Sequence, residues 1–190
     1  MTATGAELND LLLGCYRQET AAQQRLYRNW YGFAHAKAGP YGQDTAEVEE
    51  IVQDAFLKVL LALTRDPFVG NFAGYFHRII VNAGIDYYRR AHRRRRHETL
   101  LADQPPVAED GCNAALAQLE REDCIQFLQR LPPTYRIVFT LYVFEGYSHP
   151  EIADRLGISE GTSRSYLFKA RRALRPLVGP YLHPNHLQNE

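Results

Sequence analysis

The sequence of 190 residues contains no hydrophobic run that approaches the roughly 20 apolar residues required by a membrane-spanning helix. Acidic residues, Glu7 and Asp10, lie beside its first apolar cluster, where a secretory signal would have a basic leader. Its three cysteines, Cys15, Cys112 and Cys124, form no CxxC pair, which favours reduced thiols over disulfides or a zinc site. We therefore expect a cytoplasmic protein that does not insert into membranes and needs no metal ion or other cofactor.

Net charge is also lacking, because 22 basic and 22 acidic residues cancel. The cancellation hides two basic clusters: residues 77–97 contain seven arginines and one acid, and residues 164–175 contain five basic residues and no acid. Acidic residues gather instead at 44–54 and 103–123. This polarity indicates a polyanion bound at two places, with acidic surfaces left for other partners. Charge alone does not separate DNA from RNA.

Strand patterns are scarce as well, because helical periodicity dominates the chain. We expect an all-α protein with two small helical domains joined by a flexible acidic linker. The linker is placed at 101–113, where prolines, a glycine and several acids interrupt the apolar pattern. It separates a domain at 1–100 from a domain at 114–178, and a mobile tail follows at 179–190. The predicted helices span 6–18, 20–37, 45–64, 71–94, 114–130, 133–145, 148–156 and 160–175.

Residues 148–175 have the most informative local pattern. A short amphipathic helix ends at Gly157, which supplies a left-handed turn, and Ser159 is a favourable N-cap for the next helix. Leu167 and Leu174 belong to the inner stripe of that second helix. The layout predicts a helix-turn-helix whose second helix enters the DNA major groove; the alternative is a surface pair of helices with a solvated basic face. The predicted DNA contacts are Thr162, Arg164, Ser165, Phe168, Lys169 and Arg172.

The helix at 45–64 has two leucines, Leu57 and Leu61, on the face opposite its apolar stripe. An exposed apolar spot surrounded by charge is typical of a docking surface. The alternative is that both leucines pack on another helix of the same domain. The predicted docking face consists of Glu50, Gln53, Asp54, Leu57 and Leu61.

The helix at 71–94 combines positive charge for phosphate, an amide able to read a base edge and an aromatic ring able to stack on a base. The predicted nucleic-acid contacts on it are Tyr75, Arg78, Asn82, Arg89 and Arg93. Ile85 falls on the same face by its spacing. Asp86 and Arg90 stand four residues apart near the core side, and we expect them to form an ion pair. The alternative for the arginine run is a solvated or disordered basic face.

Three segments stand in a specific order: VEEIVQDAFLKVLLAL, then FAGYFHRIIVNAGIDYYRR, and after the acidic linker LQRLPPTYRIVFTLYVFEGYSHPEIADRLGISEGTSRSYLFKARRAL. The motifs IVNxxID and EIADRLGIS-x-GT are the most specific. Together the segments resemble the bacterial RNA polymerase sigma factors, and best the small two-domain group with extracytoplasmic function. The resemblance covers about residues 20–178.

The resemblance implies an initiation factor that binds core RNA polymerase and promoter DNA. Its 45–64 helix would dock on the clamp helices of the largest polymerase subunits through the docking face. The 71–94 helix would bind and help to melt the start-proximal promoter element, with Asn82 near an extruded base. The second domain would read the upstream element and touch the polymerase flap, while the linker threads through the polymerase interior. An anti-sigma factor is the further partner that such proteins usually have.

Two residues depart from the family pattern. Members usually carry a branched apolar residue where this chain has Ser163, so the packing of the recognition helix is expected to be softer. The tryptophan common near Tyr75 is absent, and Tyr75 would have to stack in its place. Both departures concern promoter preference.

Two other classes of protein are weaker readings of the same sequence. An ordinary helix-turn-helix regulator would be a dimer on palindromic half-sites, but no dimerisation helix is evident and the second basic helix would be unexplained. An enzyme acting on nucleic acid lacks a catalytic centre here: the pair His183 and His186 has no third metal ligand, and the acids at 47–54 spread outward. No GxxxxGK[ST] loop for ATP is present, so strand separation would draw on binding energy.

Overall fold

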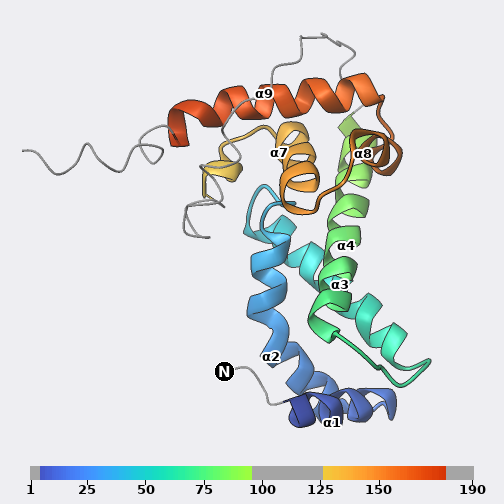
Figure 1. The fold of residues 1–190 in the computed structure, drawn as a ribbon. Helices are drawn as coiled ribbons and strands as arrows, with labels where there is room; N and C mark the ends of the chain where they lie inside the picture. The colour runs from blue at the N-terminus through green and yellow to red at the C-terminus, as the bar shows by residue number, and fades with distance from the viewer. Residues whose placement is uncertain (1–4, 96–125, 179–190) are drawn as a thin grey trace, which may run out of the picture. The chain divides into compact units, whose positions relative to one another are not determined.

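The computed structural model describes residues 5–95 and 126–178 (Figure 1). Every regular element within these ranges is a helix and none is a strand, which confirms the predicted all-α class. None of the helices in these ranges is long and apolar enough to cross a lipid bilayer. The predicted linker at 101–113, the tail at 179–190 and most of the helix expected at 114–130 lie outside the described residues.

Two compact units divide the chain, Met1–Tyr87 and Tyr88–Glu190, so the division falls inside a helix. The predicted domain boundaries stay a prediction, because the linker that defines them is not described. The first unit contains α1 (Gly5–Tyr16), α2 (Thr20–Ala38), α3 (Thr45–Leu63) and most of α4 (Phe72–Arg95). The second unit contains the end of α4, then α7 (Pro133–Phe139), the π-helical turn η1 (Thr140–Phe144), α8 (His149–Leu156) and α9 (Glu160–Val178).

The first unit is held together by the apolar stripe of α3 and by aromatic rings. α1 packs on α2 and α3, and α2 packs along α3 (Figure 1). Trp30 of α2 meets Phe72 of α4 edge-on, with ring centroids 4.8 Å apart, and Phe56 of α3 lies 4.9 Å from Phe76 of α4. The three long helices therefore share one aromatic core. The buried residues of α3 are Val48, Ile51, Val52, Ala55, Phe56, Val59 and Leu63.

Local capping and one close approach position α3 and α4. The side chain of the N-cap Asp44 accepts a backbone N–H of α3 at 2.8 Å, and Asn71 does the same for α4 at 3.1 Å. Gly84 lets α4 approach the connection between α2 and α3, because a Cβ at this position would lie 2.4 Å from Cγ of Tyr41. The absence of a side chain at Gly84 therefore fixes how closely α4 packs.

In the second unit, the single helix predicted at 133–145 is divided into α7 and η1. α7 begins at Pro133, directly after the N-cap Pro132, as the two prolines predict. In η1 the backbone N–H of Glu145 donates to the carbonyl of Thr140 at 3.2 Å, which is the five-residue spacing of a π turn. Gly146, at φ 74°, then ends the helix.

The core of the second unit lies where α7 and α8 pack against α9. Phe144, the last residue of η1, is 44% exposed, because the π turn changes the face on which it falls. The same interior holds four buried polar side chains, Arg136, Thr140, Ser163 and Ser165. Its buried apolar residues are Leu128, Leu131, Ile137, Val138, Phe139, Leu141, Ile152, Leu156, Leu167, Ala170 and Leu174.

Candidate nucleic-acid interface and docking surface

The predicted helix-turn-helix is formed by α8 and α9. The Glu151 carboxylate accepts the backbone N–H of Ser148 at 2.8 Å and its hydroxyl at 2.6 Å, which fixes the start of α8. These hydrogen bonds lower the pKa of Glu151. Gly157 ends α8 at φ 68°, in the left-handed conformation that its sequence position predicts. Ser159 then caps α9 by accepting the backbone N–H of Thr162 at 3.0 Å.

The surface of α9 agrees with the prediction except at Ser165. Arg164 and Arg172 are exposed, whereas Thr162, Phe168 and Lys169 are half-buried. Ser165 is only 4% exposed, so the expectation that it lies among the outward residues is wrong. A serine side chain is short, so longer neighbouring side chains can cover it. The helical period does not predict which residues are covered in this way.

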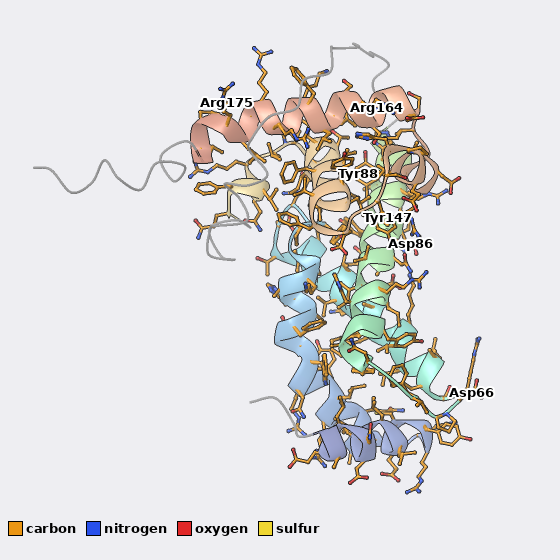
Figure 2. The ribbon with its side chains drawn as sticks, viewed as in Figure 1. Asp66, Asp86, Tyr88, Tyr147, Arg164 and Arg175 are labelled. Atoms are coloured by element: carbon orange, nitrogen blue, oxygen red, sulfur yellow. The ribbon has the colours of Figure 1, made fainter. Side chains whose placement is uncertain are left out.

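Basic side chains on α9 are held by rings and by one acid. Arg164 pairs with Glu160, one turn earlier in the helix. The guanidinium of Arg171 lies 5.8 Å from the ring centroid of Tyr142, and Nζ of Lys169 lies 5.9 Å from that of Tyr135. Sequence reasoning missed Arg171, although its spacing of seven from Arg164 places both on one flank. Arg164 and Arg175 lie toward opposite ends of α9, so basic residues extend along the helix (Figure 2).

The predicted nucleic-acid face of α4 has a mixed outcome. Tyr75, Arg78 and Arg89 are exposed and Asn82 is half-buried, in the order expected along the helix. Ile85 is only 4% exposed, so its assignment to this face is wrong. More of the circumference of α4 is therefore covered than a single apolar stripe implies. The side chain of Arg93 lies outside the described residues.

Sequence reasoning also missed the connection between α3 and α4 as part of this surface. Val69 in this connection is 91% exposed, and Gly70 follows at φ 120°. The ring of Phe68 lies 5.0 Å from Tyr75 and 5.6 Å from Phe72, measured between centroids. Tyr75 therefore has an aromatic neighbour already in place. The sequence signal was the apolar pair Phe68 and Val69, because these two residues interrupt an otherwise polar turn after Pro67.

The charged groups between α3 and α4 form one cluster. Nζ of Lys58 lies 2.9 Å from Asp86 on α4 and 2.9 Å from Asp54 on α3. Burial opposes the charge of Lys58, but its contacts with Asp86 and Asp54 outweigh burial and raise the pKa of the ammonium. The expected pairing of Asp86 with Arg90 stays a prediction. Nearby, burial and a hydrogen bond with Glu47 raise the pKa of Tyr87 to about 12.

The docking face of α3 is exposed as predicted, except at Asp54. Leu57 and Leu61 are 59% and 56% exposed, so the alternative that they pack within the domain is wrong. Glu50 and Gln53 are also exposed, whereas Asp54 is half-buried in the Lys58 cluster. Large exposed leucines on one helix face favour contact with another protein.

α2 contributes aromatic residues beside α3. Tyr27 is 36% exposed and rests on Phe56, with centroids 4.5 Å apart. Tyr31 donates a hydrogen bond to Glu49 of α3, and this bond raises the pKa of Tyr31. The surface around α3 is therefore more aromatic than the sequence of α3 alone indicates.

The described residues offer no centre for metal chemistry. Within them, no three His, Cys, Asp or Glu side chains are grouped so as to hold a metal ion. The pair His183 and His186 lies outside the described residues.

Comparison with known proteins connects both units to one family. Residues 26–94 match the model of sigma-70 region 2, and residues 121–174 match that of sigma-70 region 4. The chain is 30% identical over 172 residues to the ECF RNA polymerase sigma factor SigM of Mycobacterium tuberculosis, covering 90% of this chain and 84% of that protein. It is 31% identical over 149 residues to the ECF RNA polymerase sigma-E factor of Escherichia coli, covering 73% and 77%.

A solved structure gives a further comparison. The sigma factor RpoE from Bartonella quintana, in a complex with the anti-sigma factor NepR, aligns with a TM-score of 0.45 and 19% identity. The alignment covers 82% of this chain and 96% of that chain.

Proposed function

Because the chain belongs to the extracytoplasmic-function group of bacterial RNA polymerase sigma factors, we propose that it holds promoter DNA at two surfaces, α9 and α4, while α3 docks on core RNA polymerase. Sigma factors are initiation factors and not enzymes, and the chain directs promoter-specific transcription initiation. The proposal concerns how its two units divide this task. It also assigns the residues that perform each part.

α9 reads the upstream promoter element in the major groove. The observation that supports this role is the helix-turn-helix geometry: the left-handed Gly157 and the Ser159 cap hold the exposed Arg164 at the start of α9. The first turns of a recognition helix are the part that reaches base edges. Arg172, further along and also exposed, is placed to bind phosphate. The same unit contacts the polymerase flap.

α4 binds the start-proximal element and helps to open it. Arg78 and Arg89 are exposed for phosphate contacts, and Tyr75 offers an exposed ring with Phe68 behind it. Asn82 has an amide for the edge of an extruded base. Extrusion costs a few kcal/mol in lost stacking and pairing, which contacts with the extruded base must offset. Stacking on Tyr75 contributes about 1–3 kcal/mol toward that cost.

α3 docks on the clamp helices of core RNA polymerase. Leu57 and Leu61 supply the apolar centre of the contact, and Glu50 and Gln53 supply its charged and polar rim. Asp54 contributes through the Lys58 cluster. Polymerase then fixes the separation of the two DNA-binding units, which raises the effective concentration of each at its promoter element. Each unit alone should bind free DNA weakly.

An anti-sigma factor is the second protein partner. We propose that this partner covers α3, because the exposed Leu57 and Leu61 there form the proposed clamp contact. Covering Leu57 and Leu61 would prevent docking without altering either DNA surface. The proposal places the chain in the cytoplasm, where polymerase and DNA are found.

Selection from randomised promoters tests the proposal. The full chain is combined with purified core RNA polymerase, and transcribed templates are sequenced. We expect two separated blocks of selected bases, the block nearer the start lying within the melted region. A single palindromic block, bound equally well without polymerase, would instead support an ordinary helix-turn-helix regulator and overturn the proposal.

A further inference from the structure

A polar contact joins the two helices of the helix-turn-helix. Ser163, the fourth residue of α9, is fully buried, and its Oγ lies 2.9 Å from Nδ1 of His149, the first residue of α8. The His149 ring also stacks on Tyr142 of η1, with ring centroids 4.7 Å apart. The imidazole is therefore held from two sides, by Ser163 of α9 and by Tyr142 of η1.

The charged surroundings of His149 are mainly cationic. Partial burial, and then the nearby Arg164 and Arg171 of α9, lower the pKa of His149, while Glu160 of α9 acts in the opposite direction. The group that faces the ring from η1 is Tyr142, which also lies beneath the Arg171 guanidinium at 5.8 Å. A proton on His149 thus places a third positive charge beside two arginines.

DNA at α9 would change this balance. Phosphates next to Arg164 and Arg171 offset the repulsion that these residues exert on a charged imidazole. A ligand that favours the protonated form is, by linkage, bound more tightly by that form. We propose that proton uptake by His149 and DNA binding at α9 reinforce each other, which makes His149 a further, proton-linked contact of the upstream DNA surface. This inference rests on the proposed function, because it takes α9 as the DNA-binding helix.

The contact with Ser163 survives the change in charge. A neutral imidazole can accept from or donate to the Ser163 hydroxyl at Nδ1, and a protonated imidazole donates to Oγ. The ring is therefore held in the same place in both states. Nε2 is left to donate to a phosphate oxygen once both nitrogens carry protons. Ser163 is accordingly a positioning residue for His149.

Promoter binding by the holoenzyme at different pH values tests the inference. The full chain with core RNA polymerase is titrated with a matched promoter from about pH 8 to about pH 5.5, the range in which histidine charge changes. His149→Asn keeps a hydrogen-bonding group near the position of Nδ1 but takes up no proton. If DNA raises the pKa of His149 by one, the affinity for DNA rises about tenfold at low pH. At the acid end of the range, we therefore expect the unaltered chain to bind the promoter roughly threefold to tenfold more tightly than His149→Asn does.

His35→Asn, which removes a half-buried histidine from α2, is the matched control and should keep the pH dependence. Nuclear magnetic resonance of the full chain gives an independent readout, with the His149 ring assigned through its contact with Tyr142. An upstream duplex should raise the pKa of that ring. Identical pH dependence of the unaltered chain and His149→Asn, or an unchanged His149 titration in bound protein, would overturn the inference. Absence of promoter binding at every pH would mean that the proposed function itself has failed.

Discussion

Nζ of Lys58 on α3 lies 2.9 Å from Oδ2 of Asp86 on α4, and the same ammonium pairs with Asp54 at 2.9 Å. One cation thus connects the helix proposed to dock on polymerase with the helix proposed to bind the start-proximal element. The side chains of Lys58 and Asp86 are 38% and 51% exposed. Solvent therefore screens much of their attraction.

We expect Asp86→Asn to lower the free energy of unfolding by about 0.2–1 kcal/mol, the range for partly exposed ion pairs. The loss should shrink at high salt, because salt screens the attraction already. Urea denaturation at low and high ionic strength measures both effects. Asp66→Asn is the control, since Asp66 lies on the connection between α3 and α4 (Figure 2). The ion pairs of the described residues do not include it. A loss that is independent of salt would rule out the electrostatic explanation.

Leu57→Asp should abolish co-purification with core RNA polymerase while the helical content of the chain is retained. A carboxylate at the apolar centre of a contact has to be desolvated, whereas Leu57 is already 59% exposed and contributes little to the core. Leu13→Asp, at a leucine that is 40% exposed on α1, is the matched control and should leave binding unchanged. Equal effects of the two substitutions would show that general loss of surface hydrophobicity is responsible.

Arg164→Ala should weaken transcription from a matched promoter by about 1–3 kcal/mol, and the loss should depend on the upstream sequence. Run-off transcription on promoters altered at single upstream positions measures this dependence. Arg25→Ala removes an exposed arginine from α2 and serves as the control for net charge. If transcription falls equally on every upstream sequence, Arg164 contacts phosphate and does not read bases.

Gly157→Ala should destabilise the second unit by about 1–2 kcal/mol, because an alanine at φ 68° is in the left-handed region. No atom within 4 Å would obstruct the new Cβ, so the cost comes from the backbone alone. Gly32→Ala, in the interior of α2 and equally unobstructed, should instead stabilise the chain by about 0.5–1 kcal/mol. Denaturant unfolding of both variants would show opposite signs, and the same sign would contradict the backbone explanation.

Protonation of His149 should lower the stability of the folded chain as the pH falls. Its pKa is lowered in the folded chain, so the unfolded chain binds a proton more readily just below the ordinary value of about 6.5. The contribution of neutral His149 to folding stability is fully present above about pH 6.5, the pKa of histidine in the unfolded chain. It is lost as the pH falls from there toward the lower pKa of His149 in the folded chain. His149→Asn should flatten that part of the curve of unfolding midpoint against pH. Parallel curves for the two proteins would show that another group is responsible.

The sequence was informative wherever one residue type decides the conformation. Gly157 and Ser159 predicted the turn of the helix-turn-helix, and both have the predicted roles. The predicted start at residue 133 is correct, because α7 begins at Pro133, and Gly146 follows the predicted end at 145. The exposure of Leu57 followed from its angular position on α3, because that helix has one clear apolar stripe.

The sequence was misleading where tertiary contacts decide. Ser165 and Ile85 are buried although their helical positions suggest exposure, because exposure also depends on neighbouring side chains that the helical period does not encode. The π turn η1 has no single-residue signature, so the division of the predicted helix was missed. The sequence predicted only softer packing at Ser163. It did not predict the hydrogen bond between Ser163 and His149, because the two residues are 14 positions apart. Such pairs become visible only when both helices are placed.

The close approach of α4 at Gly84 connects two surfaces of the first unit, the docking face of α3 and the nucleic-acid face of α4. Tyr41, which occupies the space where a Cβ would lie, belongs to the stretch that leads directly into α3. Enlarging residue 84 by one methyl group would push either this ring or the α4 backbone aside. The spacing between the proposed docking face on α3 and the proposed nucleic-acid face on α4 would then shift together with it, although residue 84 belongs to neither face.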